Sequence, residues 1–231
     1  MGNIYIVGAS SGIGKQLALQ LAAKGHTVFG TYNTKSEIES TAGIHWHQLN
    51  VLDADVQLGF LPEELHGFVY CPGAIVLKPF ARIKAEEYLE DYKLQVLGAI
   101  SQLQAVLPKL KATGNASVVF FSTVAVQTGF NFHSVVSSSK GAIEGLTRAL
   151  SAELAPTIRV NCIAPSITHT PLAGTLLSTP EKIDANAQRH PLKKVGQAAD
   201  IANAAAFLLG DESAWMTGQI LRIDGGISVI K

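Results

Sequence analysis

The sequence has little of what a disulfide-stabilised, metal-binding or membrane-spanning protein needs. It contains two cysteines in 231 residues, Cys71 and Cys162, which lie far apart and form no CxxC pair. We therefore expect neither a disulfide framework nor a zinc site, and a reducing cytoplasmic environment fits best. No apolar run approaches the roughly 18–20 residues that a membrane-spanning helix requires. The N-terminus begins directly with a strand-like run at 3–7, so we expect no signal peptide.

Charge of one sign is not in excess either. Eighteen Lys and Arg residues balance 18 Asp and Glu residues, which gives a formal net charge of zero. We therefore expect neither nucleic acid nor a membrane surface as a partner. Hydrophobic residues make up 47% of the chain and charged residues only 16%, so much apolar surface has to be hidden. A sheet covered on both faces hides it, and so does oligomerisation.

The chain alternates between short runs rich in β-branched residues and longer segments with helical spacing. The strand-like runs lie at 3–7, 26–31, 44–49, 67–71, 116–122, 158–163 and 219–223. The helical segments lie at 12–24, near 35–41, and at 84–112, 136–153, 180–188 and 197–209. This alternation predicts one α/β domain over 1–231, a Rossmann fold whose doubly wound parallel sheet has about seven strands and helices on both faces. The irregular segment 166–195 is predicted to be a substrate lid.

The first strand runs directly into a glycine-rich turn, Gly8-Ala9-Ser10-Ser11-Gly12-Ile13-Gly14, and a helix follows at once. Gly8 permits the sharp exit from the strand, Gly12 lets the backbone approach a pyrophosphate, and Gly14 allows the helix to pack closely on the sheet. The phosphates would then lie at the positive N-terminus of the helix. The turn therefore predicts a dinucleotide site, since incidental glycines in a tight turn rarely take this spacing.

The end of the second strand bears on which dinucleotide is bound. An acidic residue there would bind a ribose 2′-hydroxyl and indicate NAD. This sequence has none, and offers instead Thr31, Tyr32, Asn33, Thr34 and Lys35. Hydroxyls, an amide and one lysine suit a 2′-phosphate, which favours NADP(H) over NAD(H), although the same residues would also suit an ordinary turn.

Four stretches of the chain, in order, carry a family resemblance. They are Val7-Gly8-Ala9-Ser10-Ser11-Gly12-Ile13-Gly14; Ser139-Lys140-Gly141-Ala142 with Gly145-Leu146-Thr147-Arg148; Ile158-Arg159-Val160-Asn161-Cys162-Ile163-Ala164-Pro165; and the tail from Pro191 to Gly226. The sequence resembles the short-chain dehydrogenase/reductase family along essentially its full length, and looks most like its β-ketoacyl-acyl-carrier-protein reductases. The resemblance implies a nicotinamide-dependent oxidoreductase that acts on a small-molecule carbonyl or alcohol.

The resemblance also implies a catalytic set of Asn, Ser, Tyr and Lys, from which this chain departs. In the family the Tyr transfers the proton, the Lys lowers its pKa and binds the nicotinamide ribose, the Ser binds the carbonyl oxygen, and the Asn anchors a relay water. Lys140 matches the Lys, whereas Gln95, Thr123 and Val136 stand at the Asn, Ser and Tyr positions. Thr123 keeps a hydroxyl and Gln95 an amide. Val136 keeps nothing that can transfer a proton.

Further departures lie around the cofactor. The family's Asn-Ala-Gly turn reads Cys71-Pro72-Gly73, an acidic residue after the third strand reads Asn50, and Pro-Gly after the sixth strand reads Pro165-Ser166. The turn and the resemblance together predict the residues that bind the cofactor. They are Gly8, Ser10, Ser11, Gly12, Ile13, Gly14, Thr31, Asn33, Asn50, Val51, Gly73, Lys140, Pro165, Thr168 and Thr170.

Three other side chains could replace the missing tyrosine. His133 lies one helical turn before Val136, and an imidazole suits proton transfer near neutrality. Tyr92 could face the same cavity from the long helix, and Ser137 lies on the side of Lys140, although a hydroxyl of ordinary pKa is a poor acid. We place Thr123, Lys140, Gln95 and His133 in the catalytic set.

Two functions remain open. One is an NADP(H)-dependent carbonyl reductase or alcohol dehydrogenase with an altered proton donor. The other is a weak or inactive homologue that binds the dinucleotide and serves as a sensor or binding module. In either case we expect a homodimer or homotetramer that packs through helices 84–112 and 136–153.

Overall fold

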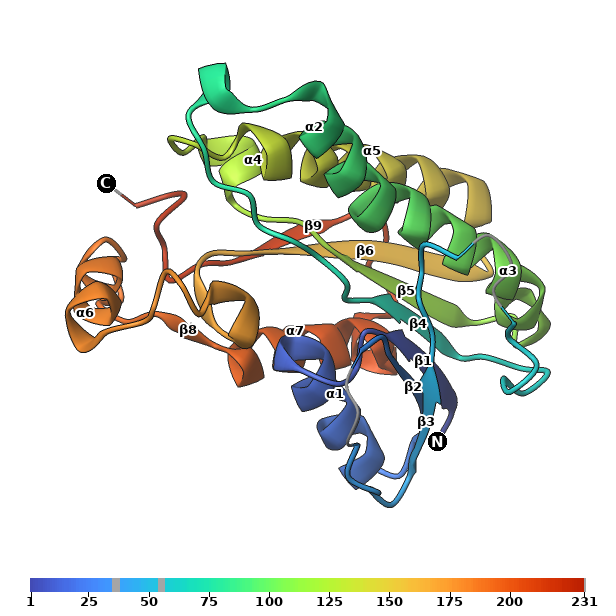
Figure 1. The fold of residues 1–231 in the computed structure, drawn as a ribbon. Coiled ribbons are helices and arrows are strands. Elements are labelled where there is room, and N and C mark those ends of the chain that lie inside the picture. The colour runs from blue at the N-terminus through green and yellow to red at the C-terminus, as the bar shows by residue number, and fades with distance from the viewer. Residues whose placement is uncertain (35–37, 54–56, 231) are drawn as a thin grey trace.

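The centre of the molecule is a parallel sheet with helices on both faces (Figure 1). The structure is a computed structural model that describes residues 1–34, 38–53 and 57–230. Its seven-stranded sheet has the order β3-β2-β1-β4-β5-β6-β9. The strands are β1 (Asn3–Val7), β2 (Thr27–Tyr32), β3 (Ile44–Gln48), β4 (Gly67–Tyr70), β5 (Ala116–Phe121), β6 (Ile158–Pro165) and β9 (Ile220–Ile223). All six pairings are parallel, which confirms the predicted single-domain Rossmann fold.

Two helical layers bury the sheet. Helices α1 (Gly12–Ala23) and α7 (Ala198–Leu209) cover one face, and α3 (Gly98–Ala112) and α5 (Ser134–Leu154) cover the other (Figure 1). The central strand β5 shows why its residues are apolar without alternation. Val118 and Phe120 pack into the core under α3 and α5, whereas Val119 and Phe121 pack into the core under α1 and α7. Successive side chains of a strand point to opposite faces, so a strand covered on both sides needs an unbroken apolar run.

The predicted helix at 84–112 is interrupted. Helix α2 (Ala85–Tyr92) passes into a π-helical turn, η2 (Lys93–Leu97), before α3 begins. A π turn carries one extra residue, and its altered hydrogen bonding can be supported by a neighbouring group. Here the Tyr70 hydroxyl on β4 donates to the Leu94 carbonyl oxygen at 2.6 Å. A Cβ at Gly98 would lie 2.4 Å from that hydroxyl, so only glycine leaves room for the contact.

Two further predictions need correction. Part of the short helix near 35–41 falls on residues 35–37, which lie outside the described residues; 38–40 are not helical, and Thr41 forms a bridge with Ile44. The segment 166–195 is also less irregular than predicted, because it contains β7 (Thr168–His169), the 3₁₀ turn η3 (Pro171–Ala173) and α6 (Pro180–Gln188). Strand β7 pairs with β8 (Gly196–Gln197).

The remaining elements are short. They are the helix α4 (Ala125–Thr128), which the sequence did not predict, and the 3₁₀ turns η1 (Phe80–Arg82) and η4 (Asp211–Ser213). Among the described residues, none of the helices is both long and apolar enough to cross a bilayer.

Strand order places the site. Strand β1 lies between β2 and β4, so the connections that leave β1 and β4 diverge to opposite sides of the sheet. In open parallel sheets such a switch point opens a crevice at the carboxyl ends of the strands, and ligands bind there. The glycine-rich turn at 8–14 lies at this point.

Candidate functional site

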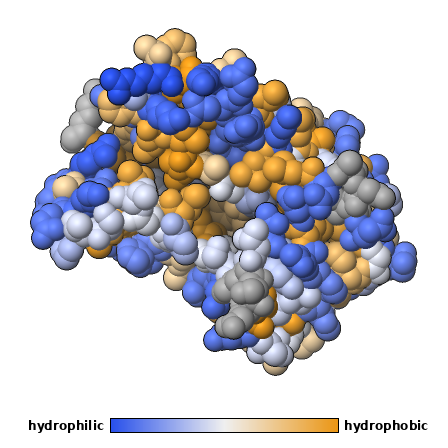
Figure 2. Space-filling view, in the orientation of Figure 1, coloured by the Kyte–Doolittle hydropathy of each residue, from blue (hydrophilic) through white to orange (hydrophobic). Residues whose placement is uncertain are grey.

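A cavity of about 840 Å³ opens at the carboxyl ends of the central strands. Figure 2 shows the hollow in this face, with hydrophobic side chains gathered along it. Every residue predicted to bind the cofactor or to act in catalysis lines this cavity. Those residues are Gly8, Ser10, Ser11, Gly12, Ile13, Gly14, Thr31, Asn33, Asn50, Val51, Gly73, Gln95, Thr123, His133, Lys140, Pro165, Thr168 and Thr170.

The glycine-rich turn has a backbone that other residues would strain. Gly8 and Gly12 have φ angles of +77° and +51°, in the left-handed region that favours glycine. A Cβ at Gly14 would lie 2.3 Å from the Gly8 carbonyl oxygen, so α1 can approach β1 only without a side chain there. The turn is also tied to β2, because the Gly8 amide donates to the Thr31 hydroxyl at 3.1 Å and the Ala9 amide donates to the Thr31 carbonyl at 2.8 Å.

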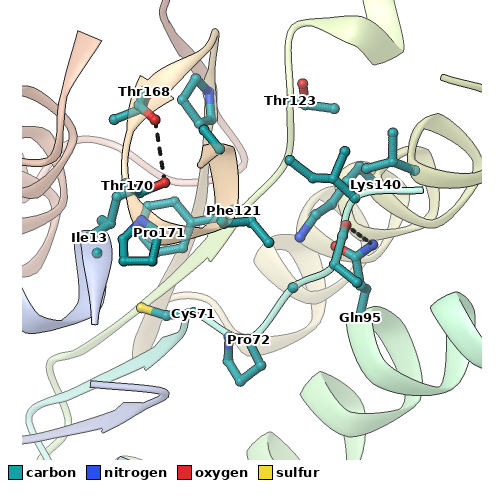
Figure 3. A pocket seen from close by; sticks show the side chains of 18 of the residues that line it. Ile13, Cys71, Pro72, Gln95, Phe121, Thr123, Lys140, Thr168, Thr170 and Pro171 are labelled. Carbon is teal, nitrogen blue, oxygen red and sulfur yellow. Dashed lines mark hydrogen bonds between the residues drawn. The ribbon is translucent and has the colours of Figure 1, made fainter. Parts of the chain in front are cut away.

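The N-terminus of α1, at the glycine-rich turn, can bind a phosphate. The first turn of α1 holds no acidic residue, and Ser11 makes no side-chain cap, so amide groups at the positive end of the helix can bind a ligand. Figure 3 shows Thr170 and Pro171 beside Ile13, on one side of the cavity. A Cβ at Gly12 would lie 3.3 Å from the Thr170 Cβ, so the turn can pack this closely against Thr170 only with glycine at position 12. The turn therefore offers the backbone amides at the N-terminus of α1 to a pyrophosphate.

The part of the cavity that lies after β2 is polar, but no acidic residue lines it. Tyr32, Asn33 and Thr34 line the cavity after β2, while Lys35 lies outside the described residues. Asn50 is held in a turn, because its amide donates to the Asp53 carboxylate at 2.8 Å.

Lys140, Gln95 and Asp91 form a buried polar group at the other end of the cavity. The Gln95 amide nitrogen donates to both carboxylate oxygens of Asp91, each at 2.8 Å. Burial lowers the pKa of Lys140 to about 8, against the opposing influence of Cys162 and Asp91. Lys140 therefore loses its proton at a lower pH than a lysine in water, although it is still mostly an ammonium at pH 7.

The same group has an unused acceptor that fits a ligand. The Gln95 Oε1 is buried and has no hydrogen-bond partner in the structure. Gly73 lies in front of it, since a Cβ there would be 3.3 Å from Gln95 Oε1 and 3.8 Å from Lys140 Nζ. Figure 3 shows Lys140 and Gln95 side by side on one wall. A buried acceptor next to an ammonium donor suits the hydroxyls of a nicotinamide ribose.

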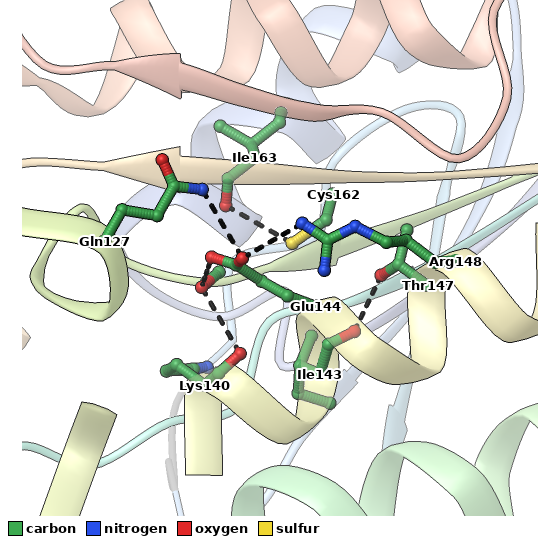
Figure 4. Close-up of polar contacts among 9 residues, drawn as sticks. Gln127, Lys140, Ile143, Glu144, Thr147, Arg148, Cys162 and Ile163 are labelled. Atoms are coloured by element: carbon green, nitrogen blue, oxygen red, sulfur yellow. Dashed lines mark hydrogen bonds and ion pairs between the residues drawn. The ribbon is translucent and has the colours of Figure 1, made fainter. Parts of the chain in front are cut away.

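Lys140 is positioned from beneath by a second network (Figure 4). The Ser122 hydroxyl, just after β5, donates to the buried Glu144 carboxylate at 2.9 Å and lies 3.4 Å from the Lys140 carbonyl oxygen. Gln127 and Arg148 also donate to Glu144, at 3.4 and 3.5 Å. These contacts fix α5 against the end of β5, and so fix the starting point of the Lys140 side chain.

An apolar side chain, Val136, stands at the position where the resembled family has its tyrosine. Val136 is 5% exposed and lines the cavity. Among the proposed substitutes, His133 lines it too, with Nδ1 2.8 Å from the Asn131 carbonyl. Tyr92, which lies just before the π turn, is not among the lining residues and so is no substitute at this cavity. Ser137 bonds to the Ala125 carbonyl at 3.3 Å, outside the lining.

The sequence did not reveal a polar pair on the far wall. The Ser166 hydroxyl lies 2.8 Å from His190 Nε2, and both residues line the cavity. Ser166 carried a weak signal, because it stands where the resembled family has glycine. His190 carried none, since 24 residues separate the pair. Nearby, the Arg189 guanidinium lies 5.5 Å from the centre of the Phe130 ring at the same cavity.

Neither cysteine is activated. Burial raises the pKa of both the Cys71 and Cys162 thiols to about 12, with a smaller opposing effect from Lys140. Cys71 lines the cavity and both cysteines are free thiols. No cluster of three or more potential metal ligands occurs within residues 1–34, 38–53 and 57–230.

Known proteins match most of this chain, and some match nearly all of it. The family described as enoyl-(acyl carrier protein) reductase matches residues 8–228. The bovine (Bos taurus) L-xylulose reductase is 30% identical over 231 residues, covering 96% of this chain and 94% of that protein. A tropinone reductase homologue from Arabidopsis thaliana is 37% identical over 158 residues, which cover 68% of this chain and 60% of the relative's length.

Solved structures agree on the fold. The ligand-free aldohexose dehydrogenase of Thermoplasma acidophilum superposes with a TM-score of 0.90 at 23% identity, covering 100% of this chain and 95% of that one. The structure of ElxO with NADP bound superposes with a TM-score of 0.85 at 24% identity, covering 98% of this chain and 99% of that one.

Proposed function

Because the chain belongs to the short-chain dehydrogenase/reductase family, we propose that it transfers a hydride between NADP(H) and a small-molecule carbonyl or alcohol, using a non-standard active site. The observation that carries the proposal is the continuous cavity that joins the glycine-rich turn to Lys140 and Gln95. When bound, the nicotinamide cofactor supplies or accepts the hydride.

The residues of the chain have separate tasks in this proposal. The turn at 8–14 binds the pyrophosphate through backbone amides, and the Lys140 ammonium and Gln95 Oε1 bind the nicotinamide ribose. Thr123 binds the oxygen of the substrate, because it lines the cavity on the loop after β5, where the neighbouring Ser122 hydroxyl already donates to Glu144. The main role of Lys140 in this proposal is to bind the cofactor, since the chain has no tyrosine at position 136 whose pKa the lysine could lower.

Two observations favour NADP(H) over NAD(H). No acidic residue follows β2, where Tyr32, Asn33 and Thr34 line the cavity, and an acid at that point would repel a 2′-phosphate. The fold neighbour ElxO also has NADP bound. We accordingly propose Ser10, Ser11, Thr31, Asn33, Asn50 and Val51 on the adenosine side, and Gly73, Pro165, Thr168 and Thr170 on the nicotinamide side.

The substrate is proposed to enter under the segment 166–195, which acts as a lid. The L-xylulose reductase among the relatives acts, by its name, on a sugar ketone, so short ketoses are the first compounds to try. Lid residues Leu172, Ala173 and Leu176 line the cavity, so part of the substrate surface is apolar.

The test begins with binding and then measures turnover. Calorimetric titration with NADPH and NADH should show tighter binding of NADPH. A screen of ketoses, acetoacetyl thioesters and simple ketones should then show NADPH oxidation with at least one class. Gly12→Ala should weaken NADPH binding, because the added Cβ crowds Thr170 and displaces the turn, whereas Gly114→Ala is the matched control. Gly114 has a similar φ of +69° but no atom within 4 Å of its Cβ position.

One observation favours a second function. Val136 offers no proton donor at the cavity, so the chain could bind NADPH as a sensor or binding module. Tight NADPH binding without turnover on any carbonyl would establish that alternative, and absence of NADPH binding would contradict both functions.

We also propose a homodimer or homotetramer that packs through the surfaces of 84–112 and 136–153. Leu89 and Leu97 are about half exposed on the first of these segments. Size-exclusion chromatography with light scattering should show a dimer or a tetramer, and a stable monomer would contradict this proposal.

A further inference from the structure

Ser166 and His190 form a directed hydrogen-bonded pair that the proposed function has not yet used. His190 is 3% exposed, and both of its ring nitrogens have partners. Nδ1 lies 2.7 Å from the Asn186 carbonyl oxygen, and Nε2 lies 2.8 Å from the Ser166 hydroxyl. The pair connects the end of β6 to the end of α6, across the base of segment 166–195.

The partners determine where the hydrogens lie. A carbonyl oxygen can only accept, so His190 Nδ1 must carry a hydrogen. In the neutral ring, Nε2 is then an acceptor and Ser166 donates to it. In the imidazolium, Nε2–H donates to Ser166, and the Ser166 hydrogen becomes available to a group in the cavity. The pair can therefore take up one proton from the cavity or release one into it.

The surroundings of His190 can support the charged ring. The Asn186 carbonyl belongs to the last turn of α6, where the helix dipole favours a positive charge. His190 and Ser166 also line a second cavity of about 300 Å³. The charged side chains at that cavity are Asp200, Asp224 and Lys194, and Arg189 and Lys140 are at the main cavity. Both carboxylates are therefore at the second cavity, and the cations are divided between the two cavities.

Ser166 stands next to the proposed reaction site. The Ser122 amide donates to the Ile163 carbonyl at 2.7 Å, and the Val124 amide donates to the Pro165 carbonyl at 3.2 Å. The two loops that carry Thr123 and Ser166 therefore run side by side from β5 and β6. Each presents a hydroxyl-bearing residue to the same cavity, and Val136 lines that cavity without a proton to give.

We propose that Ser166 is the catalytic proton donor of this enzyme and that His190 is the positioning residue that supplies its proton. This inference rests on the proposed function. In the reduction, a hydride adds to the carbonyl carbon and the C=O π electrons move to oxygen. The oxygen takes the Ser166 Oγ hydrogen while Ser166 takes the Nε2 hydrogen of the His190 imidazolium. The products are the alcohol, oxidised cofactor and neutral His190, which regains a proton from water; oxidation reverses each step.

The experiment compares two substitutions with matched controls, using the best carbonyl substrate found in the screen. Ser166→Ala and His190→Gln should each lower kcat about a hundredfold, the size typical of lost general acid catalysis. NADPH affinity should stay within about twofold, because neither change removes a proposed cofactor contact. Ser40→Ala and His45→Gln should leave kcat unchanged, since both residues are exposed, lie outside segment 166–195 and line neither described cavity.

The pH profile separates proton supply from a structural role. In the native protein, kcat for reduction should fall with rising pH, and this limb should be absent in His190→Gln and Ser166→Ala. Side-chain ¹H–¹⁵N correlation spectra, assigned with His190→Gln, should show neutral His190 protonated on Nδ1. A neutral ring protonated on Nε2 would overturn the relay, as would an unchanged rate and pH limb in both variants.

Failure of the proposed function gives a different pattern. Native protein that binds NADPH but reduces no carbonyl would remove the reductase function, and the relay with it. Turnover in the native protein that survives both substitutions would leave the reductase standing and overturn the relay alone.

Discussion

The two ends of the cavity are built in different ways. The cofactor end is made of backbone: two glycines with positive φ, a third that lets α1 approach β1, and amides at a helix N-terminus. The reaction end is made of side chains from separate elements, with Lys140 on α5, Gln95 in the π turn, and Ser166 hydrogen-bonded to His190. A backbone site tolerates no change of residue type at its glycines, whereas a side-chain site can change its chemistry and keep its shape.

The largest effect is expected from a substitution at the cofactor end of the cavity, which is made of backbone. Gly14→Ala places a Cβ 2.3 Å from the Gly8 carbonyl oxygen, so α1 must move away from β1. We expect a loss of about 1–3 kcal/mol in the free energy of unfolding and no measurable NADPH binding. Denaturant unfolding and calorimetric titration measure these.

The control for that change is Gly59→Ala, because no atom lies within 4 Å of the Gly59 Cβ position. It should leave both measurements near their native values. Native-like NADPH affinity in Gly14→Ala would show that the close approach of helix to strand is dispensable.

The reaction end should instead accept a change of chemistry. Val136→Tyr, introduced into Ser166→Ala, puts a phenol where the resembled family has one, within reach of the Lys140 ammonium. We expect kcat for carbonyl reduction to recover by roughly tenfold or more, since general acid catalysis contributes about 10²–10⁴-fold. Val136→Phe in the same background is the control, and equal recovery by phenylalanine would mean that the cavity's shape, not the proton, was restored.

Lys140 joins the two ends, and its removal sharpens the comparison. Lys140→Met should weaken NADPH binding about tenfold, because a charged hydrogen bond to the ribose contributes about 1.5–3 kcal/mol and part of it is offset by desolvation. With the pKa of Lys140 lowered to about 8, native affinity should fall as pH rises through 8. The variant should lack this pH dependence, and a persistent decline would assign it to another group.

The lowered pKa of Lys140 also makes the free energy of unfolding depend on pH. The unfolded chain, with Lys140 near its ordinary value of 10.5, binds more protons than the folded chain between pH 8 and 10.5. The contribution of Lys140 to the free energy of unfolding therefore rises with pH across that window. Without cofactor, Lys140→Met should unfold at neutral pH no more easily than the native protein.

The smallest effect is expected at the two cysteines, whose thiols should not react in the folded protein. Burial raises the pKa of Cys71 and Cys162 to about 12, and the thiolate is the reactive form. Iodoacetamide at neutral pH should therefore label neither thiol in the folded protein and both after denaturation, as mass spectrometry would show. Rapid labelling of Cys71 would mean that the cavity end of β4 is more open to water than its burial indicates.

The same contrast explains what could be predicted from the sequence. Strand and glycine positions follow from local backbone preferences, so the sequence located all seven strands of the main sheet, and every residue predicted to bind the cofactor lines the cavity. The break at 93–97 depends on a tyrosine hydroxyl from another strand, which helical periodicity does not report. The Ser166–His190 pair depends on how segment 166–195 folds back on itself, and only an unusual serine after β6 pointed to it.

The π turn makes the residues at three positions, 70, 95 and 98, depend on one another. The Tyr70 hydroxyl reaches the Leu94 carbonyl oxygen only because Gly98 has no side chain, and Gln95 projects from the turn so held. A relative with alanine at the Gly98 position must therefore also lose the tyrosine hydroxyl or regularise its helix. These three features should covary among descendants of this chain, and the direction of the amide at position 95 should change with them.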